Sequence, residues 1–202
     1  MDDRLSVHVV AGGDSSTADL VRGLTSLSVD RKSRLELQVA TKRSPALALL
    51  AQPCDVFVLS GHGYSDNNEE PAQWLLGGQT PASAVFTRAD VPATFAASFV
   101  IFDTCGAHTL LPGLRIGLDP LVTLAYGSTN EDDFSSVASA QHTRVLRFIE
   151  AALDGAAMPG GGYDEPDFTK TALRRTWDWV TTHTLTSPRN PRYLLIPPVP
   201  VG

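Results

Sequence analysis

The amino-acid sequence predicts an α/β protein of three layers, in which helices flank a central, mostly parallel sheet. Two unbroken apolar runs, at residues 56–59 and 99–102, are typical of parallel strands that are buried on both faces. Segments with the two-residue period of strands alternate along the chain with segments of helical period, as in β-α-β units. The 202 residues suffice for one domain of this kind, spanning residues 1–202.

The first third of the chain supplies clear strand and helix signals. Residues 5–11 form an expected strand, and residues 35–39 alternate apolar with polar side chains, as a half-exposed strand does. Between them, residues 16–19 resemble a capping box and begin a helix whose apolar face carries Leu20, Val21, Leu24 and Leu27. Gly23 weakens the propensity of that helix.

A second helix is expected at residues 46–51, with Ser44 as its N-cap and Pro45 at its first position. Residues 64–94 are less regular, with a polar loop, a short β excursion at 74–78 and a short helix from Asp90.

The remainder of the chain continues the alternation. A fifth strand is expected at residues 121–126, and a final edge strand at 193–196. Helices are expected at residues 139–153 and after a cap at Asp167, with Trp177 in the core.

Two reactive side chains follow the two apolar runs. His62 ends the first, between two glycines, and Cys105 ends the second, before Gly106. Because chemistry in open parallel sheets collects beyond the carboxyl ends of the strands, both side chains are expected at the same edge. If the strands are neighbours, an imidazole faces a thiol, as nucleophilic catalysis requires.

These motifs carry a family resemblance. Ser60-Gly61-His62-Gly63 and Asp103-Thr104-Cys105-Gly106 resemble the catalytic motifs of the caspase-like cysteine peptidases, most closely the metacaspase and bacterial caspase-homologue branch. Residues 128–136 are similar to the acidic segment that ends the next metacaspase strand. The chain departs from the family after the nucleophile, where metacaspases usually have His-Ser-Gly and this sequence has Gly106-Ala107-His108.

The resemblance implies a cysteine endopeptidase of caspase-like fold with a role for each site residue. Cys105 is the expected nucleophile and His62 the general acid and base, while the amides of Gly63 and Cys105 form the oxyanion hole. Asp103, with Asp133 or Asp132, is expected to bind a basic P1 side chain, so that cleavage follows Arg or Lys. The alternative for Asp103 is a structural carboxylate that caps backbone amides.

By the same resemblance, residues 1–111 correspond to a large subunit and residues 118–202 to a small one. Arg115 lies in the connection between them, where self-cleavage is expected to be possible.

Other interpretations of these residues remain open. Cys105 alone could be a core thiol, and Cys105, His108 and His62 together could be read as metal ligands, although a zinc site needs further ligands. The fold could also persist as a catalytically inactive interaction module, or use the same dyad on esters. No cofactor is expected; Asp66, Asn67, Glu69 and Glu70 could bind calcium, but a solvated acidic loop is favoured.

Composition limits the partners and the compartment. A formal net charge of −6 disfavours nucleic acid as a main partner and suits a peptide substrate with a basic residue. No apolar run spans a membrane, and the start of the chain does not read as a signal peptide. Cys54 and Cys105 are expected about 20 Å apart and therefore unpaired, which favours the cytoplasm.

Overall fold

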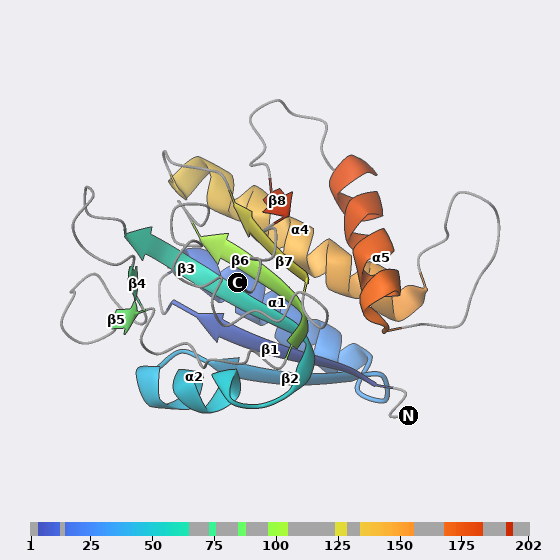
Figure 1. Ribbon diagram of the computed structural model, residues 1–202, viewed down its shortest axis with the longest axis horizontal. Coiled ribbons are helices and arrows are strands. Elements are labelled where there is room, and N and C mark those ends of the chain that lie inside the picture. The colour runs from blue at the N-terminus through green and yellow to red at the C-terminus, as the bar shows by residue number, and fades with distance from the viewer. Residues whose placement is uncertain are drawn as a thin grey trace, which may run out of the picture.

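The computed structural model describes residues 4–12, 15–64, 73–75, 85–87, 97–104, 124–128, 134–155, 168–183 and 193–195. Its central sheet has the strand order β2-β1-β3-β6-β7-β8 (Figure 1). The strands from β2 to β7 run parallel, and β8 pairs antiparallel with β7 at the edge. Their bounds are Leu35–Ala40 for β2, Leu5–Ala11 for β1, Cys54–Tyr64 for β3, Ala97–Thr104 for β6, Leu124–Ser128 for β7 and Tyr193–Leu195 for β8.

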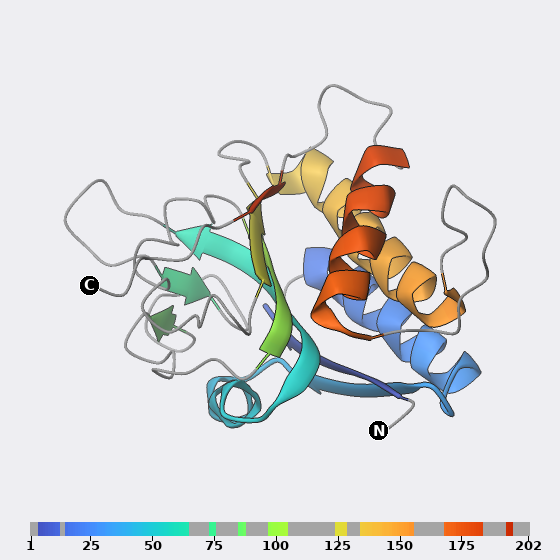
Figure 2. The same ribbon diagram turned by 45° about the vertical axis from the view of Figure 1, so that its right-hand side comes forward.

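Helices cover both faces of this sheet. Helices α1 (Ser15–Asp30), α4 (Phe134–Asp154) and α5 (Lys170–His183) lie on one face, and α2 (Arg43–Leu50) lies on the other (Figures 1 and 2). The predicted three-layer α/β architecture with a mostly parallel sheet is therefore confirmed. In the described parts of the chain, no helix is long and apolar enough to cross a bilayer.

The main core lies between the sheet and helices α1, α4 and α5. Three aromatic rings from three elements form its centre. The ring centroid of Phe99 in β6 lies 5.1 Å from that of Phe148 in α4 and 5.8 Å from that of Trp177 in α5. Phe148 and Trp177 meet edge to face at 5.3 Å, a favoured geometry for aromatic pairs. The prediction that Trp177 belongs to the core is confirmed.

Two helix starts differ from the predicted ones. α1 begins at Ser15, so Ser16 lies inside the helix instead of capping it, and the Thr17 hydroxyl donates to the carbonyl of Gly12. α2 begins at Arg43, with Lys42 as an N-cap that makes no side-chain bond, so Ser44 and Pro45 both lie in the first turn. Pro45 is tolerated there because the first N–H groups of a helix have no acceptor within it.

The later elements are also shifted from the predicted bounds. α4 starts five positions before the expected residue 139, at Phe134. β7 (Leu124–Ser128) ends two residues after the predicted end at 126, and residues 121–123 of the predicted strand lie outside the described residues. The hydroxyl of Thr169 accepts a hydrogen bond from the amide of Ala172 at 3.3 Å, so Thr169 caps α5. Asp167, the predicted cap, lies outside the described residues.

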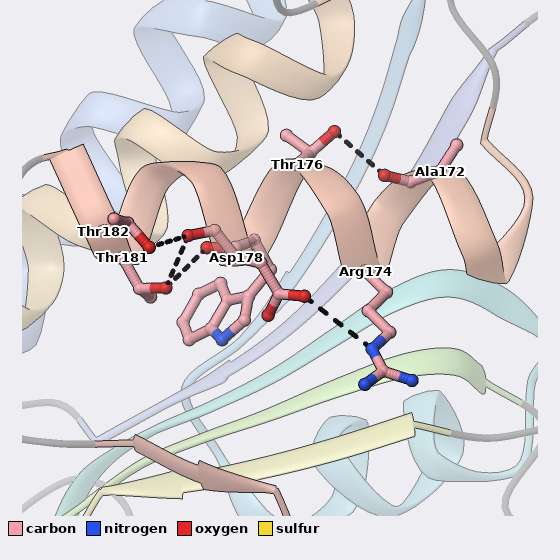
Figure 3. Close-up of polar contacts among 7 residues, drawn as sticks. Ala172, Arg174, Thr176, Asp178, Thr181 and Thr182 are labelled. Carbon is pink, nitrogen blue, oxygen red and sulfur yellow. Dashed lines mark hydrogen bonds and ion pairs between the residues drawn. The ribbon is translucent and has the colours of Figure 1, made fainter. Parts of the chain in front are cut away.

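The side-chain hydrogen bonds and the ion pair within α5 are local (Figure 3). The hydroxyls of Thr176 and Thr182 donate to carbonyls one turn earlier, at 3.0 Å from Ala172 O and 2.7 Å from Asp178 O. Arg174 and Asp178 are 3.7 Å apart and exposed, a type of pair that contributes little to stability. Burial of its apolar side chains therefore does most to hold α5 in place.

Gly23 lies where α1 meets α4. A Cβ atom added to Gly23 would come within 2.7 and 2.8 Å of the two methyl carbons of Leu146. The helix therefore loses propensity at this position but gains a close approach to α4, which explains a glycine in its interior.

We expect Trp177→Ala to lower the free energy of unfolding by about 3–5 kcal/mol, because it leaves a cavity beside Phe99 and Phe148. Trp179→Ala is the matched control: this ring is only partly buried and stacks on His183, so its loss should be clearly smaller. Urea denaturation of both variants measures the difference; equal losses would contradict the assignment of Trp177 to the core.

In a helix without a close neighbour, a change from glycine to alanine stabilises by about 1 kcal/mol. We expect Gly23→Ala not to stabilise this protein, because the new methyl group meets Leu146. In a Leu146→Ala background the same change should become stabilising. A double-mutant cycle of unfolding free energies measures this coupling, and additive effects would show that the two helices do not meet at this point.

Candidate functional site

The two strands expected to carry the reactive residues are direct neighbours at the centre of the sheet. β3 and β6 pair in parallel, with Val58 opposite Ile101, Ser60 opposite Asp103 and Gly61 opposite Thr104. In the sequence, His62 follows Gly61 and Cys105 follows Thr104. The predicted adjacency of the two strands is confirmed, while Cys105 and the side chain of His62 lie outside the described part of the structure.

β3 changes partner at the position of the expected catalytic histidine. Gly61 adopts a φ of 155°, a backbone conformation that residues other than glycine rarely adopt. Beyond it, His62 and Gly63 pair antiparallel with Leu75 and Trp74 of β4 (Gln73–Leu75), which in turn pairs with β5 (Val85–Thr87). The strand therefore extends two residues past His62. The β excursion predicted at 74–78 is confirmed for Trp74 and Leu75 of β4, while residues 76–78 lie outside the described part of the structure.

A buried polar pair joins β3 to β6 just before the two reactive positions. The hydroxyl of Ser60 donates to Oδ2 of Asp103 at 3.2 Å, and the two residues are 2% and 0% exposed. Both lie on the same sheet face as Val58 and Ile101, the face covered by the main core. Sequence reasoning singled out Asp103 but missed Ser60, although Ser60 precedes His62 by the same two positions by which Asp103 precedes Cys105.

The environment of Asp103 bears on its expected role. A carboxylate that binds the P1 side chain of a substrate has to be reached from solvent, whereas Asp103 is fully buried and has a hydrogen-bond partner within the protein. Burial of this kind is typical of a structural carboxylate, since charges inside proteins are retained only with partners. The observation favours the structural alternative for Asp103.

Several other expected residues lie outside the described ranges. Among them are the acidic P1 candidates Asp132 and Asp133, Arg115 in the connection, His108, and the acidic loop residues 66–70. Within the residues that the structure does describe, no group of three or more His, Cys, Asp or Glu side chains could hold a metal ion.

The second cysteine lies at the opposite end of the strands. Cys54 is the first residue of β3, opposite Ala97 at the start of β6, and it is a free, buried thiol. Burial raises the pKa of the Cys54 thiol to about 12, and the charge of Asp55 adds a smaller increase. A hydrogen bond with the backbone of His8 lowers the pKa, but by less. Cys54 is therefore a thiol at neutral pH and no nucleophile, because only thiolates react readily.

The structure also places two histidines outside the proposed site, one exposed and one buried. His183 is exposed at the end of α5, where its Nδ1 lies 2.8 Å from the carbonyl of Trp179. His8 is in the core, 1% exposed in the middle of β1, and its Nδ1 has no hydrogen-bond partner among the residues that the structure describes. Burial lowers the pKa of His8, outweighing the bond to the Leu49 backbone and the carboxylates of Glu36 and Asp55, which raise it.

No protein-family model matches this chain, and no curated protein matches it in sequence. The case for a caspase-like peptidase accordingly rests on the residues themselves: the two motifs and the pairing of the strands that carry them.

The burial of His8 predicts a loss of stability in acid. Because the native pKa lies below the ordinary value of 6.5, the unfolded chain takes up a proton that the folded chain resists. The contribution of His8 is complete above pH 6.5 and is lost as the pH falls toward the native pKa.

Urea denaturation of the wild type and of His8→Gln, at pH values on either side of 6.5, isolates this effect. The stability of the wild type should fall more steeply with decreasing pH than that of the variant, since other titrating groups are common to both. Parallel curves would mean that His8 titrates normally in the folded protein.

Proposed function

We propose that the protein is a cysteine endopeptidase of caspase-like fold, with Cys105 as nucleophile and His62 as general acid and base. The observation that carries the proposal is the register of β3 and β6, in which Gly61 lies opposite Thr104. Neighbouring strands are about 4.8 Å apart, and His62 and Cys105 are the residues that follow this pair in the sequence, so their side chains would start close enough to share a hydrogen bond.

The proposed reaction has two steps. The thiolate of Cys105 attacks the carbonyl carbon of the scissile bond, and the C–N bond breaks as His62 gives a proton to the leaving amine. Water then attacks the resulting thioester, with His62 taking its proton, and releases the carboxylate product and the free thiol. The balance needs only water and no cofactor.

The backbone beyond Gly61 supports an oxyanion hole as part of the proposal. β3 leaves the main sheet there to pair with β4, so Gly63 belongs to an arm that projects past the edge of the main sheet. An amide of Gly63 and one of Cys105 would stabilise the negative oxygen of the tetrahedral intermediate, each at about 3 kcal/mol.

Specificity for Arg or Lys at P1 is the second part of the proposal. With Asp103 buried, Asp133 and its neighbour Asp132 are the carboxylates left to bind the basic side chain. The net charge of −6 supports the attraction of cationic peptides. We propose the cytoplasm as the compartment, since a reducing environment keeps a catalytic thiol free.

Hydrolysis of peptides with Arg, Lys or Asp at P1 tests the function. We expect turnover after Arg or Lys, and Cys105→Ala should abolish it, with a loss of about a thousandfold or more. His62→Ala should cause a loss of similar size.

Cys54→Ala is the matched control, because it removes the other of the two cysteines and should leave turnover within about twofold. Iodoacetamide should label the wild type and Cys54→Ala but not Cys105→Ala. Turnover that survives Cys105→Ala would refute the peptidase, and hydrolysis of ester substrates alone would replace it with an esterase.

A further inference from the structure

We propose that the buried pair of Ser60 and Asp103 positions the ends of β3 and β6, so that both are positioning residues for the catalysis by His62 and Cys105. This inference rests on the proposed function and gives Asp103 a role inside the protein instead of in the substrate pocket.

Among the residues that the structure describes, the pair is the side-chain hydrogen bond between β3 and β6 that lies nearest to the reactive positions, one residue before the end of the register at Gly61 and Thr104. Ser60 and Asp103 are opposite each other in the register, with their side chains joined at 3.2 Å on one face. In the sequence, His62 and Cys105 follow two residues later, and two residues of an extended strand span about 7 Å. A link at this distance limits how far the two strand ends can slide or splay.

A polar link fixes register more strictly than the apolar contacts before it. Val58 opposite Ile101 would still bury apolar surface if one strand slid along the other, because the hydrophobic effect is not directional. After a slip, by contrast, Asp103 would lose the hydroxyl of Ser60 and remain buried, which is costly for a carboxylate. The hydrogen bond therefore selects one alignment of the two strands.

Ser60 is also tied to the strand on its other side. Its carbonyl accepts a hydrogen bond from the amide of Gly12 at 2.8 Å, and the carbonyl of Gly12 accepts one from the hydroxyl of Thr17 at the start of α1. A continuous chain of hydrogen bonds thus runs from α1 through the turn after β1 to Ser60 and Asp103. The edge of the sheet is braced across β1, β3 and β6 where the proposed chemistry occurs.

The experiment compares Ser60→Ala, Asp103→Asn and the double variant, with Asn chosen because it keeps the shape of Asp. Asp55→Asn is the matched control: Oδ2 of Asp55 accepts the amide of Ser6 at 2.8 Å, so this carboxylate links β1 to β3 at the opposite end of the strands. All variants are made in the Cys54→Ala background, which leaves Cys105 as the single thiol.

Each of Ser60→Ala and Asp103→Asn should lower kcat by about tenfold for every cleaved P1 residue, with KM nearly unchanged, because small misplacements of reacting groups are costly. The double variant should be little worse than Asp103→Asn, since both changes remove the same bond. The pH profile of iodoacetamide labelling at Cys105 should also shift, while Asp55→Asn should leave kcat and the labelling profile unchanged.

The inference is overturned if Asp103→Asn raises KM only for Arg and Lys substrates while Ser60→Ala has no effect, which would place Asp103 in the substrate pocket. Unaltered kcat and labelling in both variants would overturn it as well. If the wild type cleaves no peptide, the proposed function fails on its own, and the labelling profile still decides whether the pair positions Cys105.

Discussion

The structure depends on the parallel pairing of β3 with β6 at the centre of the sheet. Each strand has a further neighbour, β1 beside β3 and β7 beside β6, so their backbone groups are paired on both sides. Their apolar side chains are buried on both faces, as for Phe57 and Val58 of β3. A strand pair confined in this way cannot move without opening the core, so the carboxyl ends of the two strands are held at a fixed edge.

Polar links occur at both ends of this apolar centre, and they differ in how deeply they are buried. At the amino end, Asp55 accepts the amide of Ser6 in a part-buried bond. At the carboxyl end, the bond between Ser60 and Asp103 is fully buried. Burying a carboxylate away from water lowers the stability of the fold, and apolar residues at the same position would give a more stable protein. The cost is understandable if the carboxyl end needs an exact alignment that apolar contacts do not supply.

Local sequence signals predicted the elements of the fold well but not their ends. The run before His62 predicted a buried parallel strand. The extension of that strand to Tyr64 depends on its pairing with β4, which the apolar run does not signal. The early start of α2 escaped prediction because Pro45 suits any position in a first helical turn. Ser60 escaped because its partner Asp103 becomes a neighbour only through the sheet register.

Strand polarity also separates the roles of the two cysteines. Cys54 begins β3 and is buried with a pKa of about 12, so its sulfur is protonated and shielded. In the sequence, Cys105 directly follows Thr104, the last residue of β6, so it comes after the carboxyl end of its strand. Parallel strands make their two edges chemically unequal, since the loops after the carboxyl ends bring different strands together. The proposed dyad relies on this difference, because β6, which precedes Cys105 in the sequence, is the direct neighbour of β3, which carries His62.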